Sequence, residues 1–330
     1  MKMLRQPFFL LSIVLQLSCF CCLGQQHVVQ LDRVPCKCVY TAEQGRLTGP
    51  YVSFYNNGSK RCEGNLVNGY RTGRWIVWDS TGQKRMERMY KNPFEFTRIY
   101  PPIPNEGPIP LLSQNRYRLE YDSNGIIKYA KLKAENAIWR HKYWRRLAPA
   151  NNAILFKDNS ILKIFLDQLV SRSLTVFDIT DDRFTTPLDP DKLLNEIGTQ
   201  KIELVALELK EENIFDMERL VSEYRIIGIC PIVKVNGETR SLFWVYYPDI
   251  RKRFGQEKLT INDPAIRSLD DLFTFRRFSS AIIKTTVDNP FDRFLKDIPG
   301  ITASNMAKEQ EAQELILIEE ENNIWLGLTK

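Results

Sequence analysis

Residues 45–92 contain an internal repeat, which constrains the fold more than any other feature of the sequence. Residues 49–58 (GPYVSFYNNG) align with residues 73–82 (GRWIVWDSTG), 24 positions later. A partial third copy, YDSNGIIK, occupies residues 121–128. Repeats of this length indicate stacked supersecondary units, each of which needs its neighbour to cover its apolar face.

One repeat unit reads as a β-hairpin. Asn57-Gly58 and Thr81-Gly82 predict tight turns, because glycine adopts positive φ at little steric cost. Aromatic side chains mark the short β segments: Tyr51, Phe54, Trp75 and Trp78. Most of these rings are expected to stack the hairpins on one another. A glycan or a lipid headgroup bound on exposed rings is the alternative interpretation.

The pattern of a glycine, two spaced aromatic residues and a turn glycine, followed by a basic returning strand, resembles the MORN-type repeat. The resemblance implies a twisted, meandering sheet and an interaction surface. We place this β repeat region at residues 36–130. A proline-rich insertion at residues 93–116 interrupts it and is expected to be extended and non-helical.

The N-terminus predicts export. Lys2 and Arg5 precede an apolar stretch at residues 8–17, and small residues surround a cleavage position after Gly24. This is the layout of a signal peptide over residues 1–24, and the apolar stretch is too short for a membrane span. Lipidation at Cys19 is the second choice. We therefore expect an exported protein.

Cys36, Cys38 and Cys62 lie in one small β region outside the predicted signal peptide. An oxidising compartment permits a disulfide, with Cys62 joined to Cys36 or Cys38 as the candidate pairing. The histidines, His27 and His141, have no metal-ligand spacing to these cysteines. The sequence therefore predicts structural or free thiols, without a metal or a cofactor.

The second part of the chain, residues 131–330, predicts a mixed α+β domain. Asn236-Gly237 indicates a central antiparallel hairpin, with strands at residues 223–235 and 241–247. Further strands are expected at residues 174–177 and 202–209. Helices are expected at residues 139–147, 160–170, 191–197, 268–283 and 304–320. Residues 139–147 would form an amphipathic helix with a basic face.

We find no motif for catalysis in the sequence, because a nucleophile elbow, a P-loop and a dinucleotide-binding fingerprint are all missing. The carboxylate pairs Asp181-Asp182 and Asp270-Asp271 lie where aspartate favours turns and helix starts, so a structural role is preferred over glycoside hydrolysis. The acids Glu311, Glu314 and residues 319–321 are expected on a solvated helix face.

The formal net charge is only +6 over 330 residues, with basic side chains scattered among acids. This distribution argues against a nucleic-acid partner.

Several segments from Trp139 onward closely resemble the GldN/PorN family of the Bacteroidetes type IX secretion and gliding machinery. They are residues 144–147 (WRRL), 173–178 (SLTVFD), 181–187 (DDRFTTP), 223–231 (EYRIIGICP), 243–248 (FWVYYP), 269–273 (LDDLF), 277–280 (RFSS) and 292–293 (DR). The resemblance covers residues 133–328. It implies a non-enzymatic subunit of an envelope ring, located in the bacterial periplasm and associated with the outer membrane through a partner. The implied partners are a GldK/PorK-like outer-membrane lipoprotein and a GldM/PorM-like inner-membrane protein.

The repeats in front depart from the family pattern and suggest a paralogue with its own docking module. Because aromatic side chains and arginine are the usual interface anchors, we take a set of them as partner-binding candidates, each of which singly favours the core. The set is Trp139, Tyr143, Arg145, Phe184, Tyr246, Tyr247 and Phe278. The alternative function is an exported glycan- or lipid-binding module built on the repeat aromatics.

Overall fold

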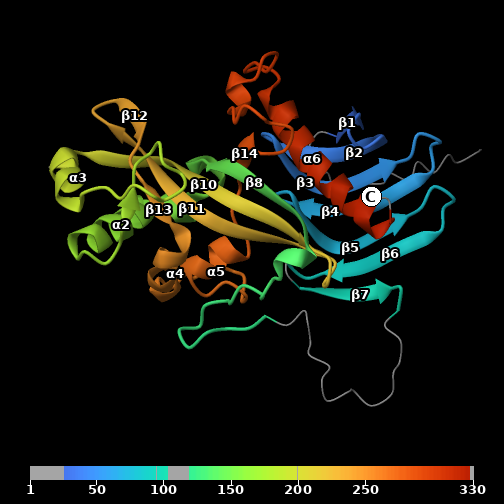
Figure 1. Ribbon diagram of the computed structural model, residues 1–330, viewed down its shortest axis with the longest axis horizontal. Coiled ribbons are helices and arrows are strands. Elements are labelled where there is room, and N and C mark those ends of the chain that lie inside the picture. Colours follow the sequence, from blue (N-terminus) through green and yellow to red (C-terminus); the bar gives the residue numbers. More distant parts are fainter. Residues whose placement is uncertain (1–25, 94, 103–118, 199, 328–330) are drawn as a thin grey trace, which may run out of the picture.

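The computed structural model describes residues 26–93, 95–102, 119–198 and 200–327. Within these ranges the chain forms two antiparallel seven-stranded sheets that lie side by side (Figure 1). The first sheet is N-terminal, and helices accompany the second. This arrangement confirms the predicted α+β fold class. The predicted signal peptide and Cys19 lie outside the described residues.

The first sheet is a simple meander in sequence order. Its strands are β1 (Gln26–Leu31), β2 (Cys36–Glu43), β3 (Arg46–Phe54), β4 (Lys60–Val67), β5 (Tyr70–Trp78), β6 (Lys84–Tyr90) and β7 (Phe96–Tyr100). Each sequence repeat supplies one hairpin, β3–β4 and then β5–β6. Gly58 and Gly82 close the two turns at positive φ, as predicted.

The sheet is larger than the repeats alone. It begins ten residues before the predicted boundary at residue 36, and β7 uses part of the predicted proline-rich insertion. The partial third repeat does not join it. Residues 121–128 form a separate hairpin with a bridge between Tyr121 and Ile127, and Ile127 packs into the core of the second region.

The second sheet has the strand order β14-β8-β10-β11-β13-β9, with β12 paired to β11. The bounds are β8 (Ala137–Leu147), β9 (Val176–Phe177), β10 (Ile202–Asp216), β11 (Val221–Val235), β12 (Glu238–Ser241), β13 (Trp244–Tyr246) and β14 (Ala281–Thr285). The Asn236-Gly237 turn is confirmed between β11 and β12. The predicted single return strand is wrong: it is split into β12 and β13, and a helix begins at Tyr247.

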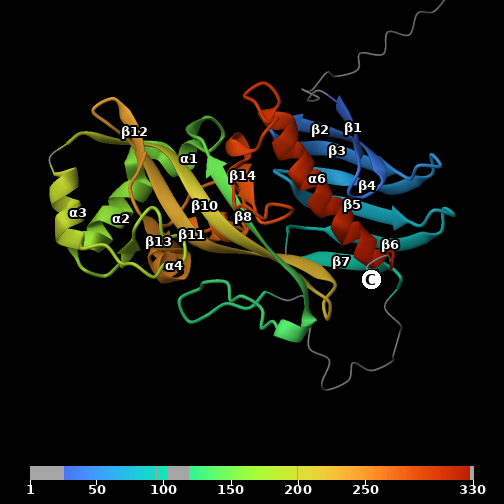
Figure 2. The same ribbon diagram turned by 45° about the horizontal axis from the view of Figure 1, so that its top comes forward.

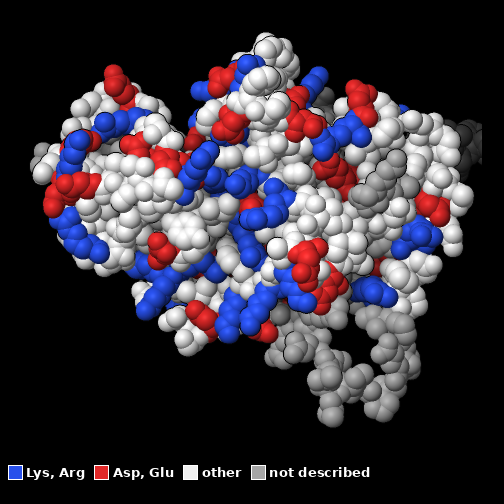
Figure 3. Space-filling view, in the orientation of Figure 1, with Lys and Arg blue, Asp and Glu red and all other residues white. Residues whose placement is uncertain are grey.

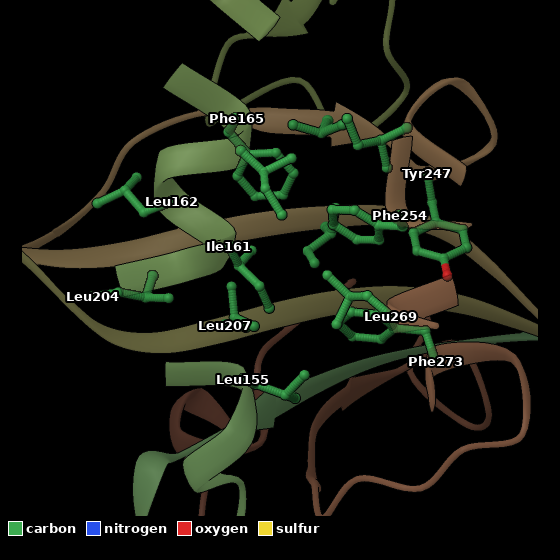
Figure 4. Packing of buried hydrophobic residues seen from close by; sticks show 14 of the residues in the cluster. Leu155, Ile161, Leu162, Phe165, Leu204, Leu207, Tyr247, Phe254, Leu269 and Phe273 are labelled. Carbon is green, nitrogen blue, oxygen red and sulfur yellow. The ribbon is translucent and has the colours of Figure 1, made fainter. Parts of the chain in front are cut away.

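Helices pack on one face of this sheet. They are α1 (Ala153–Phe156), α2 (Ser160–Val170), α3 (Pro190–Ile197), α4 (Tyr247–Gln256), α5 (Leu269–Thr274) and α6 (Met306–Trp325). Short 3-10 turns occupy Ala134–Asn136, Pro149–Asn151, Lys157–Asn159 and Leu295–Asp297. In Figure 4, side chains of α2, α4 and α5 converge on Leu204 and Leu207 of β10 to form the main apolar core.

The helix predicted at residues 268–283 has the right start and the wrong end. Ser268 and Asp271 form the expected capping box at the start of α5. The helix stops after Thr274, and Arg276 takes a positive φ. Residues 281–285 then form β14, which pairs with β8. The edge position beside β8 therefore overrides the helical spacing of the apolar residues.

The helix predicted at residues 139–147 is wrong, because this segment is strand β8. It pairs with β10 on one side and β14 on the other. Its side chains alternate with a period of two, so Tyr143, Arg145 and Leu147 lie on the helix-covered face and are buried. Aromatic residues suit a pleated, half-buried strand at least as well as a helix.

Helix α6 crosses the first sheet and also contacts β14 of the second (Figures 1 and 2). Of its predicted solvated acids, Glu320 is partly buried and the rest are fully buried, namely Glu311, Glu314, Glu319 and Glu321, so the predicted solvated face is wrong. Glu319 accepts a hydrogen bond from Arg61 at 2.6 Å, Glu321 pairs with Arg71, and Glu311 accepts one from Tyr40 at 2.9 Å. Glu314 pairs with Arg145 of β8. Ion pairs on α6 thus join the two sheets.

Candidate interaction surface

The face of the second sheet opposite the helices carries a row of paired side chains, and we call it the outer face. The strand register aligns Lys284, Trp144, Lys210, Gly228 and Tyr246 across β14, β8, β10, β11 and β13. Trp144 and Trp244 anchor a separate small core here, distinct from the main one. An aromatic and cationic cluster therefore marks the middle of the outer face.

The loop of residues 178–187 covers this row and places Phe184 on it. Phe184 has a φ of 62°, which is unusual for a bulky residue. Its ring lies directly over Gly228, where a Cβ would come within 2.6 Å of the Phe184 Cζ. Ring centroids of Phe184 and Tyr246 are 5.3 Å apart, and those of Phe184 and Trp244 are 6.4 Å apart. Close packing against glycine thus fixes the strained loop.

Asp181 holds the loop in shape. Its carboxylate accepts hydrogen bonds from the backbone N–H groups of Arg183, Thr185 and Thr186 and from the Thr185 hydroxyl. Desolvation raises the pKa of Asp181, but the hydrogen bonds from Thr185 and its neighbours outweigh it and bring the pKa to about 2. Asp181 is therefore a loop-stabilising carboxylate.

Two lysines lie within the aromatic cluster. Lys210 Nζ is 5.1 Å from the Trp144 ring centroid and pairs with Asp182 at 3.1 Å. Lys284 Nζ is 4.0 Å from the same ring and pairs with Asp292 at 2.8 Å. Burial lowers the pKa of Lys210. Each cation therefore contacts both an aromatic face and a carboxylate, which organises the cluster before any partner arrives.

Exposed charges and apolar atoms surround the cluster. Arg140 pairs with Glu212 at 2.9 Å, and the Arg146 Nε donates to Glu208 at 3.1 Å. Tyr246 is 37% exposed, and Ile179, whose carbonyl accepts the Trp244 indole N–H, is 48% exposed. An aromatic centre with a charged rim is the usual composition of a protein–protein contact surface.

The structure brings two of the sequence-predicted partner-binding candidates together, namely Phe184 and Tyr246. Trp139 is half-buried on the opposite face and donates to Asn213 at 2.7 Å. The remaining candidates are corrected to core residues, since they are buried: Tyr143, Arg145, Tyr247 and Phe278. Trp144, Lys210 and Ile179 were missed. The alternation of basic and aromatic residues along 139–147 could have revealed Trp144 had this segment been read as a strand.

The repeat aromatics divide in the same way. Tyr51 and Trp75 are buried and stack at 5.7 Å on the face that α6 covers. Phe54 and Trp78 are half-buried. The other face of the sheet has a hollow of about 370 Å³, lined by Val39, Val52 and Ile76 among others. Of the four repeat aromatics, Tyr51 borders it but is 2% exposed, and Phe54, Trp75 and Trp78 do not line it, so the predicted site of exposed rings is not assembled there.

Cys36, Cys38 and Cys62 have free, buried thiols. Cys38 and Cys62 align through Ser53 of the intervening strand β3, which puts them two strand spacings apart. That is roughly 9.6 Å, beyond the range that a disulfide bridges. This geometry disfavours the pairing with Cys62.

The acids considered for catalysis have structural partners. Asp182 binds Lys210, and Asp271 caps α5. Asp270 accepts hydrogen bonds from the Arg251 guanidinium at 2.9 Å and from the Tyr247 hydroxyl at 3.1 Å, inside the core. Burial raises the pKa of Asp270, against the lowering effect of Arg251. Each carboxylate is thus occupied by contacts that stabilise a loop, a helix end or the core.

The family model described as "Gliding motility associated protein GldN" matches residues 132–326. The chain belongs to the GldN family. GldN proteins are components of the gliding-motility and type IX secretion machinery. The match covers the whole second sheet, its helices and α6, whereas the first sheet precedes it. The resemblance of the first sheet to MORN-type repeats stays a prediction.

A comparison with curated protein sequences finds no match. Among the described residues, none of the helices combines the length and apolar character needed to cross a bilayer.

Proposed function

We propose that this GldN protein is a non-enzymatic, periplasmic subunit of an envelope ring in the gliding and type IX secretion machinery. It acts by protein–protein contact, and the outer face of its second sheet is the contact surface. The observation that supports this most directly is the cluster of Phe184, Tyr246 and Ile179, because it lies inside the family-matched region and exposes apolar atoms within a charged rim.

The expected partners are a GldK/PorK-like outer-membrane lipoprotein and a GldM/PorM-like inner-membrane protein. Across the face drawn in Figure 3, basic and acidic side chains are interspersed, with a local gathering of basic ones in the middle. Mixed charge of this kind favours a protein partner over a nucleic acid. The acids that could have served in catalysis all make contacts that stabilise the fold, which supports a role without turnover. These acids are Asp181, Asp182, Asp270 and Asp271.

The first experiment is an affinity pull-down of the tagged full-length protein from gently solubilised envelopes, with mass spectrometry of the co-purifying proteins. Recovery of both expected partners in comparable amounts supports the ring-subunit role. A monomer that recovers neither partner contradicts it.

Two variants then test the surface. Truncating Ile179 and Tyr246 together to alanine should weaken partner recovery by about tenfold or more, since hot-spot truncations typically cost over 1 kcal/mol. Tyr121→Ala is the matched control, because Tyr121 is an exposed ring, 43% accessible, in the hairpin of residues 121–128, whose Ile127 packs into the main core on the other side of the sheet. If the control lost partner recovery equally, or if the double variant lost none, the contact would lie on another surface.

A further inference from the structure

The first sheet and α6 enclose a cluster of metal-ligand groups that the proposed function does not use. The Sγ atoms of Cys36 and Cys38 and a carboxylate oxygen of Glu319 all lie within 4.8 Å of one another. All three residues are fully buried. The two cysteines stand two positions apart on β2, so their side chains leave the same face of the strand. Glu319 approaches from the second-last turn of α6, 6 residues before its end at Trp325.

We propose that Cys36, Cys38 and Glu319 bind one zinc ion. The two Sγ atoms are 3.7 Å apart. Tetrahedral zinc with Zn–S bonds of about 2.3 Å requires a sulfur–sulfur separation of about 3.8 Å. The Tyr51 hydroxyl lies 3.4 Å from Cys38 Sγ and donates a hydrogen bond to Glu319, which also accepts one from Asn322 at 3.0 Å. A water molecule can complete the coordination, as it does at zinc sites with three protein ligands.

Charge balance favours a divalent ion. Without metal, two neutral thiols lie beside Glu319, whose carboxylate is paired with the Arg61 guanidinium at 2.6 Å. Binding replaces the two thiol protons with one zinc ion, Zn²⁺ + 2 RSH → Zn(SR)₂ + 2 H⁺. The cluster is therefore neutral before and after binding, which matters because an unbalanced charge is costly to bury. A monovalent soft cation would leave one negative charge uncompensated.

Both thiols must lose a proton to bind the metal, so binding should release two protons and weaken as the pH falls. A zinc ion here would join β2, outside the family match, to α6 inside it.

The test uses the full-length protein, reduced and freed of metal with a chelator, and then titrated with Co²⁺ as a spectroscopic substitute for zinc. We expect a thiolate-to-cobalt charge-transfer absorption that saturates at one ion per chain and is reversed by Zn²⁺. Cys36→Ser and Cys38→Ser should each abolish it. Cys62→Ser should retain it, because Cys62 is equally buried but lies two strands away.

X-ray absorption of the zinc-loaded wild-type protein gives a second readout that does not depend on variants folding. The proposal expects two sulfur ligands at about 2.3 Å and lighter atoms in the remaining positions. It is overturned by a shell without sulfur, by one with four sulfurs, or by a folded, reduced protein that takes up no metal. Equal cobalt binding in Cys36→Ser, with an unchanged circular dichroism spectrum, would also overturn it.

Discussion

The interface under α6 and the outer face of the second sheet use the same residue types in opposite surroundings. Beneath α6, Arg61 and Arg145 pair with Glu319 and Glu314, and all four are buried. On the outer face, Arg140 pairs with Glu212 while its own side chain is 66% exposed. The former contacts hold two sheets together, whereas the latter surround exposed aromatic rings.

The difference shows that burial decides what an ion pair contributes. An exposed pair is screened by water and typically adds at most about 1 kcal/mol. A buried pair repays the desolvation of both charges only while both partners remain, so its loss is far more damaging than its net contribution suggests. The α6 interface is therefore intolerant of single changes, and the outer face is free to vary for recognition.

Truncating one arginine of β8 at a time should give the largest difference in stability between the two environments. Arg145→Ala leaves the buried Glu314 without its cation, while Glu211 keeps Arg276, and should cost about 3–5 kcal/mol of unfolding free energy. Arg140→Ala, on the same strand, should cost at most about 1 kcal/mol. Urea unfolding followed by circular dichroism measures both. Similar costs for the two variants would mean that α6 does not bury its ion pairs.

Adding one methyl group to a glycine tests the packing in each region. A Cβ at Gly64 would overlap the ring of the fully buried Trp75, so Gly64→Ala should cost about 1–3 kcal/mol in urea unfolding. At Gly228 the nearest atoms belong to Phe184, on a partly exposed loop outside the main core, and Trp244 lies 3.2 Å away.

Gly228→Ala should therefore cost less stability than Gly64→Ala. It should instead speed amide hydrogen exchange in residues 178–187 and lower partner recovery in the pull-down. If Gly228→Ala destabilised the whole protein as much as Gly64→Ala, the loop would belong to the core rather than to a contact surface.

Local signals in the sequence were enough for much of the fold. The repeat and its turn glycines predicted the hairpins of the first sheet, and Asn236-Gly237 and the Ser268 capping box fixed two further features. Each of these depends on neighbours a few residues away. The prediction for residues 139–147 was wrong because their aromatic spacing fits both a helix and a strand. Only the pairing with β10 and β14 decides between the two.

The side-chain clusters of the interaction surface and of the α6 interface could not be predicted from the sequence, because they depend on long-range contacts. Arg145 and Glu314 are separated by 169 residues, so the sequence does not show that they pair. The acids of α6 were therefore predicted to lie on a solvated helix face. Phe184 and Tyr246 were identified by residue type, yet their meeting over Gly228 depends on the sheet register. The approach of Glu319 to Cys36 and Cys38 likewise requires the packing of α6 on the first sheet.

Acidification should give the smallest effect, and on the outer face it should act on the loop of residues 178–187. The pKa of Asp181 in the folded protein is about 2, below its ordinary value of 3.8. The carboxylate contribution to loop order is therefore complete above about pH 4 and is lost as pH falls toward 2. Hydrogen exchange of residues 178–187 should accelerate in that window. In Asp181→Asn the loop should exchange faster at neutral pH and lose most of this dependence, keeping only the part that Asp178 contributes through the hydrogen bonds it accepts from Thr180. An unchanged profile in the variant would assign the acid sensitivity to other groups.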